Sequence, residues 1–297
     1  MIFFSVIIPT YNRAHFILEA VDSILAQNYS SFEAIIVDDG STDNTRSVIE
    51  NKYARDTRVR YFQKKNEERG AARNFGLKEA KGNYAVFFDS DDWMQPHYLD
   101  TLKNVIDQQP GIFLVAAKYN YSNEGKIEEH DAMQPLTKGW YDRNFFLKGN
   151  ILACNYCVRI GDFRYKFFPE ERELASMEDW LFLLLNMENE KIYLEDKICV
   201  TMRQHDERSM QNNQKVIAAR QKATDWLIQH ISLNKNEQKD LLAWSHYFCG
   251  IHQYLDHKRK EAINETLAAI KLIGINKEFF LLLLKSMIGR KNIIRLK

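Results

Sequence analysis

Residues 84–93 read Tyr-Ala-Val-Phe-Phe-Asp-Ser-Asp-Asp-Trp, an apolar run followed at once by three carboxylates within four residues. The apolar part has the length of one buried strand, so the acids stand at its carboxyl end, where open α/β sheets place their ligands. A solvated turn would explain an isolated Asp-x-Asp pattern. The position after a buried strand favours a ligand site instead.

The cluster of Asp89, Asp91 and Asp92 is best explained by a bound cation. Like charges so close together repel one another, and removing an unpaired carboxylate from water costs on the order of several kcal/mol. Oxygen ligands select hard divalent ions such as Mg²⁺ and Mn²⁺, and these ions commonly bind substrate phosphates as well. We therefore expect a metal site and a phosphorylated substrate.

Around this stretch, apolar runs of strand length alternate with helical patterns, which predicts βαβ units and a mostly parallel sheet. Besides 84–88, we expect strands at 3–8, 32–37, 59–63 and 112–118, and helices at 14–27, 44–51, 70–80 and 96–108. From 119 to 173 the pattern weakens into polar and aromatic mixtures, and after about 214 it is helical throughout.

These patterns predict two regions. Residues 1–214 would form an α/β domain, with a regular half at about 1–118 and a less regular half at about 119–214, and residues 215–297 a helical C-terminal region. The stretch 279–297 contains five basic residues and no acidic one. Such a helix can lie in a membrane interface. Docking on the chain's own core or on a second subunit explains it equally well, and both readings stay open.

The composition is that of an ordinary globular protein of 297 residues, 45% of them hydrophobic. Its net charge of +1, from 41 basic and 40 acidic residues, disfavours a nucleic-acid binder. Four cysteines make no disulfide framework, and the N-terminus lacks a secretory signal pattern, so we expect a cytoplasmic location, with the inner face of the membrane as an open alternative. The CxxC spacing at 154–157 has no second pair or nearby histidine and is interpreted as structural. No apolar run approaches the length of a membrane span.

Two further strands end in residues that can bind a ligand. Residues 5–12, Ser-Val-Ile-Ile-Pro-Thr-Tyr-Asn, run from an apolar strand into a proline-containing turn, and residues 34–43 end in Asp-Asp-Gly-Ser-Thr-Asp. A third segment, Ala-Arg-Asn-Phe-Gly at 72–76, precedes the acidic cluster. With these motifs in order, the first hundred residues resemble the inverting family 2 glycosyltransferases of the GT-A fold, a Rossmann-like, nucleotide-sugar-binding mixed sheet flanked by helices.

The resemblance makes residues 1–214 a GT-A domain, with a nucleotide-binding half at about 1–118 and an acceptor-side half at about 119–214. It implies a UDP-sugar donor and assigns residues to it. Pro9, Thr10 and Tyr11 would border the nucleobase, and Asp39 would accept a hydrogen bond from the uracil N3–H. Arg73 would reach the base or the diphosphate, where a guanidinium matches phosphate oxygens, although an ion pair on a helix face would also explain it. One departure stands at 66–69, Asn-Glu-Glu-Arg, where many members of the family carry glycines.

The resemblance also divides the acidic cluster between ribose and metal. Asp89, with Ser90 beside it, would contact the ribose hydroxyls, and Asp91 would bind Mn²⁺ or Mg²⁺, with Asp92 as the alternative ligand. His205 matches a family histidine that approaches the metal or the diphosphate, and imidazole favours Mn²⁺ somewhat.

Residues 177–180, Met-Glu-Asp-Trp, begin an apolar helical run and match an acidic pair of the family. The match makes Asp179 the general base that takes the acceptor's proton, with capping of a helix as the structural alternative. Glu178, Arg203 and Arg208 are candidates for supporting the site or the diphosphate.

The sequence thus predicts a metal-dependent inverting hexosyltransferase that moves a sugar from a UDP-sugar to a glycan or lipid-linked glycan acceptor in cell-surface polysaccharide synthesis. A nucleotidyltransferase that makes nucleotide-sugars is one alternative, but residues 9–13 do not form the Gly-rich basic loop expected after its first strand. A non-catalytic nucleotide-sugar-binding subunit is the other. The C-terminal helices could contact a membrane or a second copy of the chain.

Overall fold

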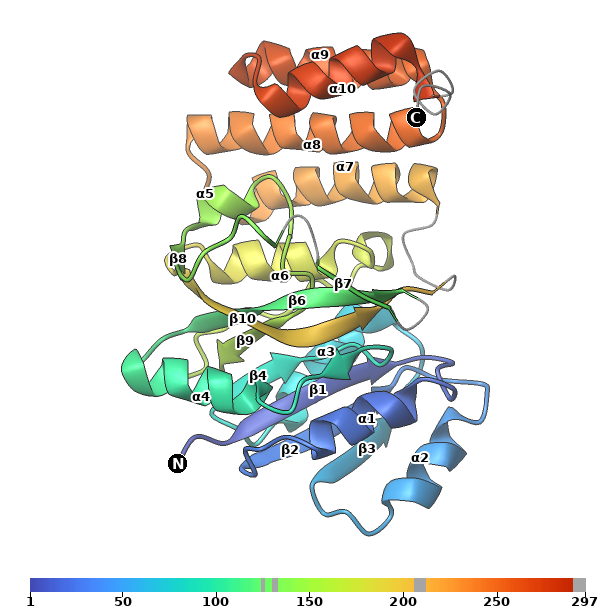
Figure 1. Ribbon diagram of the computed structural model, residues 1–297, viewed down its shortest axis with the longest axis vertical. Helices are drawn as coiled ribbons and strands as arrows, with labels where there is room; N and C mark the ends of the chain where they lie inside the picture. Colours follow the sequence, from blue (N-terminus) through green and yellow to red (C-terminus); the bar gives the residue numbers. More distant parts are fainter. Residues whose placement is uncertain (124–125, 130–132, 206–211, 291–297) are drawn as a thin grey trace. The chain divides into compact units, whose positions relative to one another are not determined.

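The computed structural model describes residues 1–123, 126–129, 133–205 and 212–290 (Figure 1). The chain divides into two compact units. The first comprises Met1–Asp142, Ile151–Arg172 and Asn189–Asp206, and the second Arg143–Asn150, Glu173–Glu188 and Glu207–Lys297. The domain boundary expected at residue 214 stays a prediction. The two compact units do not follow a single boundary in the sequence, because Arg143–Asn150 and Glu173–Glu188 belong to the same unit as the C-terminal helices.

The first unit is a mixed sheet flanked by helices, in the order β3-β2-β1-β4-β9-β6-β10-β5, with β7 paired to β6 and β8 to β10. β1, β2, β3 and β4 pair in parallel, as does β6 with β10, and the other pairs are antiparallel. The strands are β1 (Phe4–Thr10), β2 (Phe32–Asp38), β3 (Val59–Gln63), β4 (Tyr84–Phe87), β5 (Trp93–Met94), β6 (Leu114–Asn123), β7 (Lys126–Glu129), β8 (Gly139–Tyr141), β9 (Tyr156–Arg159) and β10 (Ile192–Arg203).

Helices cover both faces of this sheet: α1 (Ile17–Leu25), α2 (Thr45–Tyr53), α3 (Glu68–Glu79) and α4 (Tyr98–Gln108). Figure 1 shows α1 and α4 in front of the sheet and α3 behind it. The α3 face is closely packed, because Ala72 lies against Ile35 and Val37 of β2. The α/β expectation is confirmed, and every strand and helix expected before residue 118 is present, with ends displaced by a few residues.

Five strands of the first unit, β5, β7, β8, β9 and β10, lie outside the pattern expected from the sequence. β9 inserts antiparallel between β4 and β6, β10 pairs with β6, and the two-residue β5 closes the far edge. The CxxC segment leads into β9, and Cys154 and Cys157 are buried and form no disulfide among the described residues. Burial raises the pKa of the Cys157 thiol, as expected for a packed side chain. Asn155 between them donates to the carbonyl of Ala117 at 3.0 Å, so the motif has a structural role.

The second unit is helical: α5 (Arg143–Phe146), α6 (Glu178–Asn186), α7 (Asn213–His230), α8 (Lys235–Leu255), α9 (Arg259–Ile273) and α10 (Lys277–Ile288). In the sequence, the short 3₁₀ turn Arg172–Leu174 spans the point where a segment of the first unit ends and one of the second begins. Asn212, Asn234 and Asn276 cap α7, α8 and α10 with their side-chain oxygens. α8, α9 and α10 pack together around Ala243, Ala269 and Phe279. No helix in the described part of the chain is both long enough and apolar enough to cross a bilayer.

Candidate functional site

The carboxyl ends of β1, β2 and β4 lie side by side at one edge of the sheet. The register pairs Thr10 of β1 with Asp38 of β2, and Ile7 of β1 with Phe87 of β4. Because parallel strands end at the same edge, the residues after each strand meet there. This edge therefore brings together Thr10, Asp39 and the acidic cluster that follows Phe88.

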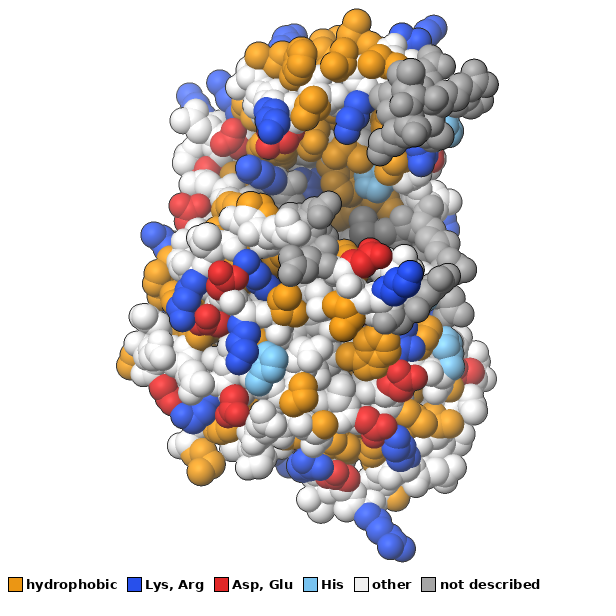
Figure 2. All heavy atoms as spheres, in the orientation of Figure 1, with side chains coloured by type: hydrophobic (Ala, Val, Ile, Leu, Met, Phe, Trp, Pro, Cys, Tyr) orange, Lys and Arg blue, Asp and Glu red, His pale blue; other side chains and the backbone are white. Residues whose placement is uncertain are grey.

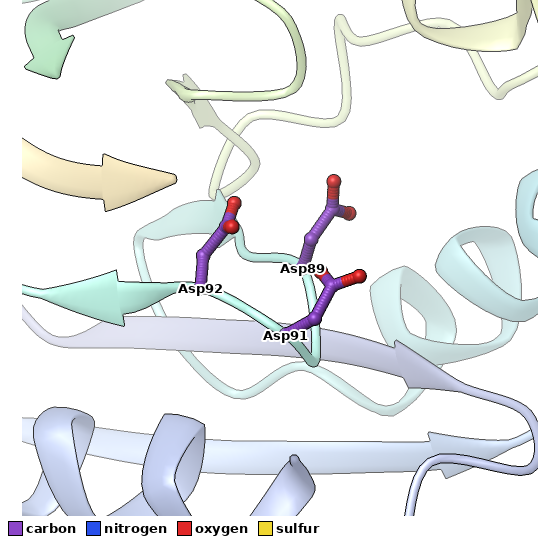
Figure 3. A group of neighbouring side chains, drawn as sticks. All are labelled: Asp89, Asp91 and Asp92. Atoms are coloured by element: carbon purple, nitrogen blue, oxygen red, sulfur yellow. The ribbon is translucent and has the colours of Figure 1, made fainter. Parts of the chain in front are cut away.

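Asp89, Asp91 and Asp92 form a compact group of carboxylates after β4 (Figure 3). One oxygen of each lies within 4.8 Å of the others, and Asp92 is buried whereas Asp89 and Asp91 are partly exposed. Figure 3 shows Asp92 pointing toward the end of β10. An all-oxygen donor set of this size fits a divalent cation such as Mg²⁺ or Mn²⁺.

Asp91 is also paired with the histidine of β10's C-terminal extension. Its Oδ2 lies 2.9 Å from Nε2 of His205, and the side chains are 23% and 11% exposed. The imidazole packs against the ring of Phe16 at 4.8 Å between centroids, which fixes its orientation. The two candidate metal ligands that are 114 residues apart in the sequence thus meet in the fold.

Asp92 is used differently, because its Oδ1 accepts a hydrogen bond from the backbone N–H of Arg203 at 3.0 Å. This bond ties the acidic loop to the end of β10. The guanidinium of Arg203 donates to Glu19 at 2.5 Å and stacks over Trp93, whose indole N–H also donates to Glu19. Arg203 therefore already has a carboxylate partner, and Arg208, the other predicted diphosphate contact, lies outside the described residues.

Arg73 is almost completely buried, at 1% exposure, and forms an ion pair with Asp89 at 2.8 Å. Its guanidinium lies over the ring of Phe168, 5.4 Å from the centroid. Next to it, Asn74 bonds the backbone of Phe168 in both directions at 2.9 Å. The Ala-Arg-Asn segment thus holds the acidic loop on one side and the segment around Phe168 on the other.

Asp39 is buried and sits in a cage of donors. Its carboxylate accepts from Nζ of Lys64 at 2.9 Å and from the backbone N–H of Glu67 at 3.0 Å. Burial alone would lower the pKa of Lys64, but its bonds to Glu67 and Asp39 raise it above the usual value. A carboxylate has about four acceptor positions, so these donors leave room for one further N–H. The neighbouring Asp38 is structural, since it accepts from Ser41 N and Tyr61 OH.

The predicted base-binding residues of β1 lie beside Asp39. Asp39 N–H donates to the carbonyl of Thr10 at 2.8 Å. Thr10 Oγ1 is buried and has no hydrogen-bond partner among the described residues, and Tyr11 is 46% exposed. Asn12, which the sequence did not single out, accepts from the backbone N–H of Thr42 at 2.8 Å and locks the two loops together. Ser90 is buried at 7% exposure within the acidic loop.

The segment 66–69, where many members of the family carry glycines, contains a residue in a conformation that favours glycine. Glu68 has φ +74°, in the left-handed region that favours glycine. Arg172 clamps this turn by an ion pair to Glu68 at 2.7 Å and a bond to Asn66 Oδ1 at 2.9 Å. Glycine would form this turn without strain. In this chain the contacts of Arg172 hold the turn instead.

Asp179 belongs to the second unit, at the start of α6. Its Oδ2 accepts from Asn150 Nδ2 at 2.9 Å and its Oδ1 from the backbone N–H of Trp180 at 2.7 Å. Glu178 beside it is buried at 3% exposure. Trp180 is anchored by its indole N–H to the carbonyl of Phe146 at 2.8 Å. The carboxylate is thus held in one orientation, and Asn150 is a positioning residue that no sequence motif indicated.

The family model described as "Glycosyl transferase family 2" matches residues 5–169. The chain belongs to this family. Among curated relatives, an uncharacterized glycosyltransferase of Rickettsia felis is 37% identical over 142 residues, 48% of this chain and 23% of its own length. Glycosyltransferase GlyA of Streptococcus pneumoniae is 37% identical over 128 residues, 42% of this chain and 18% of its own. The chain matches less than a quarter of either relative's length.

Solved structures share the fold of this chain. S. aureus TarS 1-349 in complex with UDP-GlcNAc has a TM-score of 0.70 and 22% identity, with 99% of this chain and 88% of that chain covered. A mannosyltransferase from Pyrobaculum calidifontis in complex with GDP-Man and Mn²⁺ has a TM-score of 0.60 and 16% identity, with 98% and 82% covered. The GT-A fold inferred from the sequence is thereby confirmed.

Proposed function

We propose that this chain is a metal-dependent inverting hexosyltransferase that moves one sugar from a UDP-sugar to a hydroxyl of a glycan or lipid-linked glycan, in cell-surface polysaccharide synthesis. The observation that carries the proposal is the meeting of Thr10, Asp39 and the acidic cluster at the ends of β1, β2 and β4. Family membership supports glycosyl transfer over the nucleotidyltransferase alternative. The TarS complex with UDP-GlcNAc supports a nucleotide-sugar donor.

In the proposed complex, the uracil lies against Pro9 and Tyr11, and its N3–H takes the acceptor position left on Asp39. Thr10 Oγ1, buried without a described partner, can take a further hydrogen bond there. Asp89 and Ser90 would contact the ribose. Asp89 is already oriented by Arg73, so we assign Arg73 the task of holding Asp89 and adding positive charge near the diphosphate.

We assign the metal to Asp91 and His205, with Asp92 as the alternative. Asp91 is the better exposed, whereas Asp92 is buried and bonded to the backbone of Arg203. The mixed carboxylate and imidazole set favours Mn²⁺ over Mg²⁺, and the mannosyltransferase that shares the fold was solved with Mn²⁺. When bound, the ion would offset the negative charge that develops on the diphosphate of the departing UDP.

The transfer itself needs a general base, and we assign it to Asp179. The acceptor oxygen attacks the anomeric carbon as the bond to the UDP oxygen breaks, the acceptor proton passes to Asp179, and the anomeric configuration inverts. Asn150 donates to the Asp179 carboxylate and would keep it oriented. Arg203, released from Glu19, and Arg208 would support the diphosphate, and Glu178 would support the base from the first turn of α6.

A donor screen tests the proposal. The full chain is incubated with a panel of UDP-sugars and Mn²⁺, with and without glycan and lipid-linked acceptors, and UDP release and products are measured. We expect one donor to give metal-dependent UDP release and a product of inverted configuration. UDP binding without hydrolysis or transfer of any donor would favour the non-catalytic subunit, and synthesis of a nucleotide-sugar from a nucleoside triphosphate would favour the nucleotidyltransferase.

A further inference from the structure

The last described helix, α10, has two apolar faces instead of one. Phe279 and Leu282 face the other helices and are buried with Ser286. The opposite side of the helix carries a second, exposed apolar stripe. It consists of Phe280, which is 51% exposed, Leu281 (40%), Leu284 (43%), Met287 (54%) and Ile288 (38%). The spacing i, i+1, i+4, i+7 and i+8 places all five on one helix face. Figure 2 shows hydrophobic side chains gathered over α9 and α10.

The stripe is larger than the scattered exposed residues of an ordinary surface. Leu267 on α9 and Ile275 between α9 and α10 are also exposed, at 48% and 63%. An apolar patch on this scale marks a contact surface. The charge around it indicates what covers it, because the described residues 277–290 contain three basic residues, Lys277, Lys285 and Arg290, and the single acidic residue Glu278. In a two-fold dimer through this face the excess positive charges would oppose one another, whereas an anionic lipid surface complements them.

A basic cavity adjoins the stripe at the end of α10. Its volume is about 320 Å³, and Arg259, Arg290 and Ser286 line it together with Ile288 of the stripe. The hydroxyl of Ser286 is buried without a hydrogen-bond partner among the described residues. The guanidinium of Arg290 donates to the carbonyl of Leu255, which fixes one wall. Two arginines and an unpartnered hydroxyl suit a phosphate oxygen.

We infer that α10 docks on the surface of an anionic lipid bilayer, with the stripe of Phe280, Leu281, Leu284, Met287 and Ile288 among the acyl chains and the basic cavity at the headgroup phosphates. The inference concerns the second unit and goes beyond the transfer reaction.

Sedimentation of the full chain with lipid vesicles tests it. Vesicles of phosphatidylcholine alone are compared with vesicles of phosphatidylcholine and phosphatidylglycerol in equal parts. We expect binding to the mixed vesicles and much weaker binding to phosphatidylcholine alone. The double variant Phe280→Gln/Leu284→Gln should bind mixed vesicles at least about tenfold more weakly. Phe163→Gln, at a phenylalanine of the first unit that is 82% exposed, is the matched control and should bind like wild type.

A second set of variants in the same experiment removes positive charges and leaves the apolar stripe intact. Arg259→Gln/Lys285→Gln should weaken binding to the mixed vesicles by about fivefold for each residue removed and leave binding to neutral vesicles unchanged. The inference is overturned if the wild-type chain does not bind the mixed vesicles, or if Phe280→Gln/Leu284→Gln binds them as tightly as the wild-type chain does. It is also overturned in favour of a second copy if sedimentation velocity shows self-association that this variant abolishes. UDP release measured without vesicles should be unchanged in all variants, which separates this test from the donor screen.

Discussion

Oδ2 of Asp91 lies 2.9 Å from Nε2 of His205, while Oδ1 of its neighbour Asp92 accepts the backbone N–H of Arg203 at 3.0 Å. The two adjacent aspartates therefore have different tasks. Asp92 closes the acidic loop onto β10, and Asp91 faces the imidazole and remains partly exposed. This difference is the reason for proposing Asp91 as the metal ligand, with Asp92 as the alternative.

Asp91→Asn should lower the affinity for UDP in the presence of Mn²⁺ by at least about tenfold, because one charged ligand is lost. Asp92→Asn should bind UDP close to wild type, since an amide oxygen can still accept from the Arg203 N–H. Isothermal titration with UDP, with Mn²⁺ and with a chelator, measures both. The assignment of the metal to Asp91 would be withdrawn if the two variants exchanged behaviours.

His205→Gln should change metal preference more than it changes nucleotide binding itself. The amide oxygen of Gln keeps a hard donor at this place but removes the imidazole, which favours Mn²⁺. We expect the ratio of UDP affinity in Mn²⁺ to that in Mg²⁺ to fall toward one. The same titrations run in both ions give this ratio, and an unchanged ratio would place His205 outside the metal site.

Asp179→Asn should reduce the rate of transfer by about 10² to 10⁴ and leave UDP affinity nearly unchanged, because general-base assistance is lost while the first unit is intact. Asp225→Asn, at an exposed aspartate of α7 in the same unit, is the matched control and should retain full turnover. Initial rates with the donor and acceptor found in the screen measure both. Full turnover in Asp179→Asn would show that Asp179 is not the general base.

The sequence predicted the sheet edge well, because each of its three strands is a continuous apolar run with polar residues directly after it. It did not predict β9, since Tyr156–Arg159 is four residues long and its burial depends on insertion between β4 and β6. Nor did it predict the bond from Arg203 to Asp92, which joins groups 111 residues apart. Local periodicity reports burial along one element, whereas such contacts depend on how distant elements pair.

The same limit applies to Asp179 and Asn150. The acidic pair at the start of α6 was visible as a motif, but the amide that orients it comes from a segment 29 residues earlier with no recognisable pattern. The departure from glycine at 66–69 was visible as well. Its consequence, a glutamate at φ +74° held by Arg172, could be seen only in the structure.

Glu68→Gly should therefore be more stable than Glu68→Ala by about 1 kcal/mol. Both changes remove the ion pair to Arg172, which is worth at most about 1 kcal/mol at the surface. Only glycine also relieves the left-handed backbone, which costs an L residue about 1 kcal/mol or more. Urea unfolding of the two variants gives the difference directly, and equal stabilities would show that the turn relaxes without strain.

Gly76→Ala should destabilise the chain even though alanine is the better helix former by about 1 kcal/mol. A Cβ at position 76 of α3 would lie 2.4 Å from Cγ2 of Ile7 in β1, and Ile7 is completely buried. Overpacking of this kind costs about 1 to 3 kcal/mol, which exceeds the helix-propensity gain at the upper end. The double variant Gly76→Ala/Ile7→Ala removes the obstructing methyl, so the loss caused by Gly76→Ala should shrink or reverse in the Ile7→Ala background. Urea unfolding of the wild type, both single variants and the double variant measures this coupling. Additive losses would show that the close approach of α3 to β1 does not require glycine.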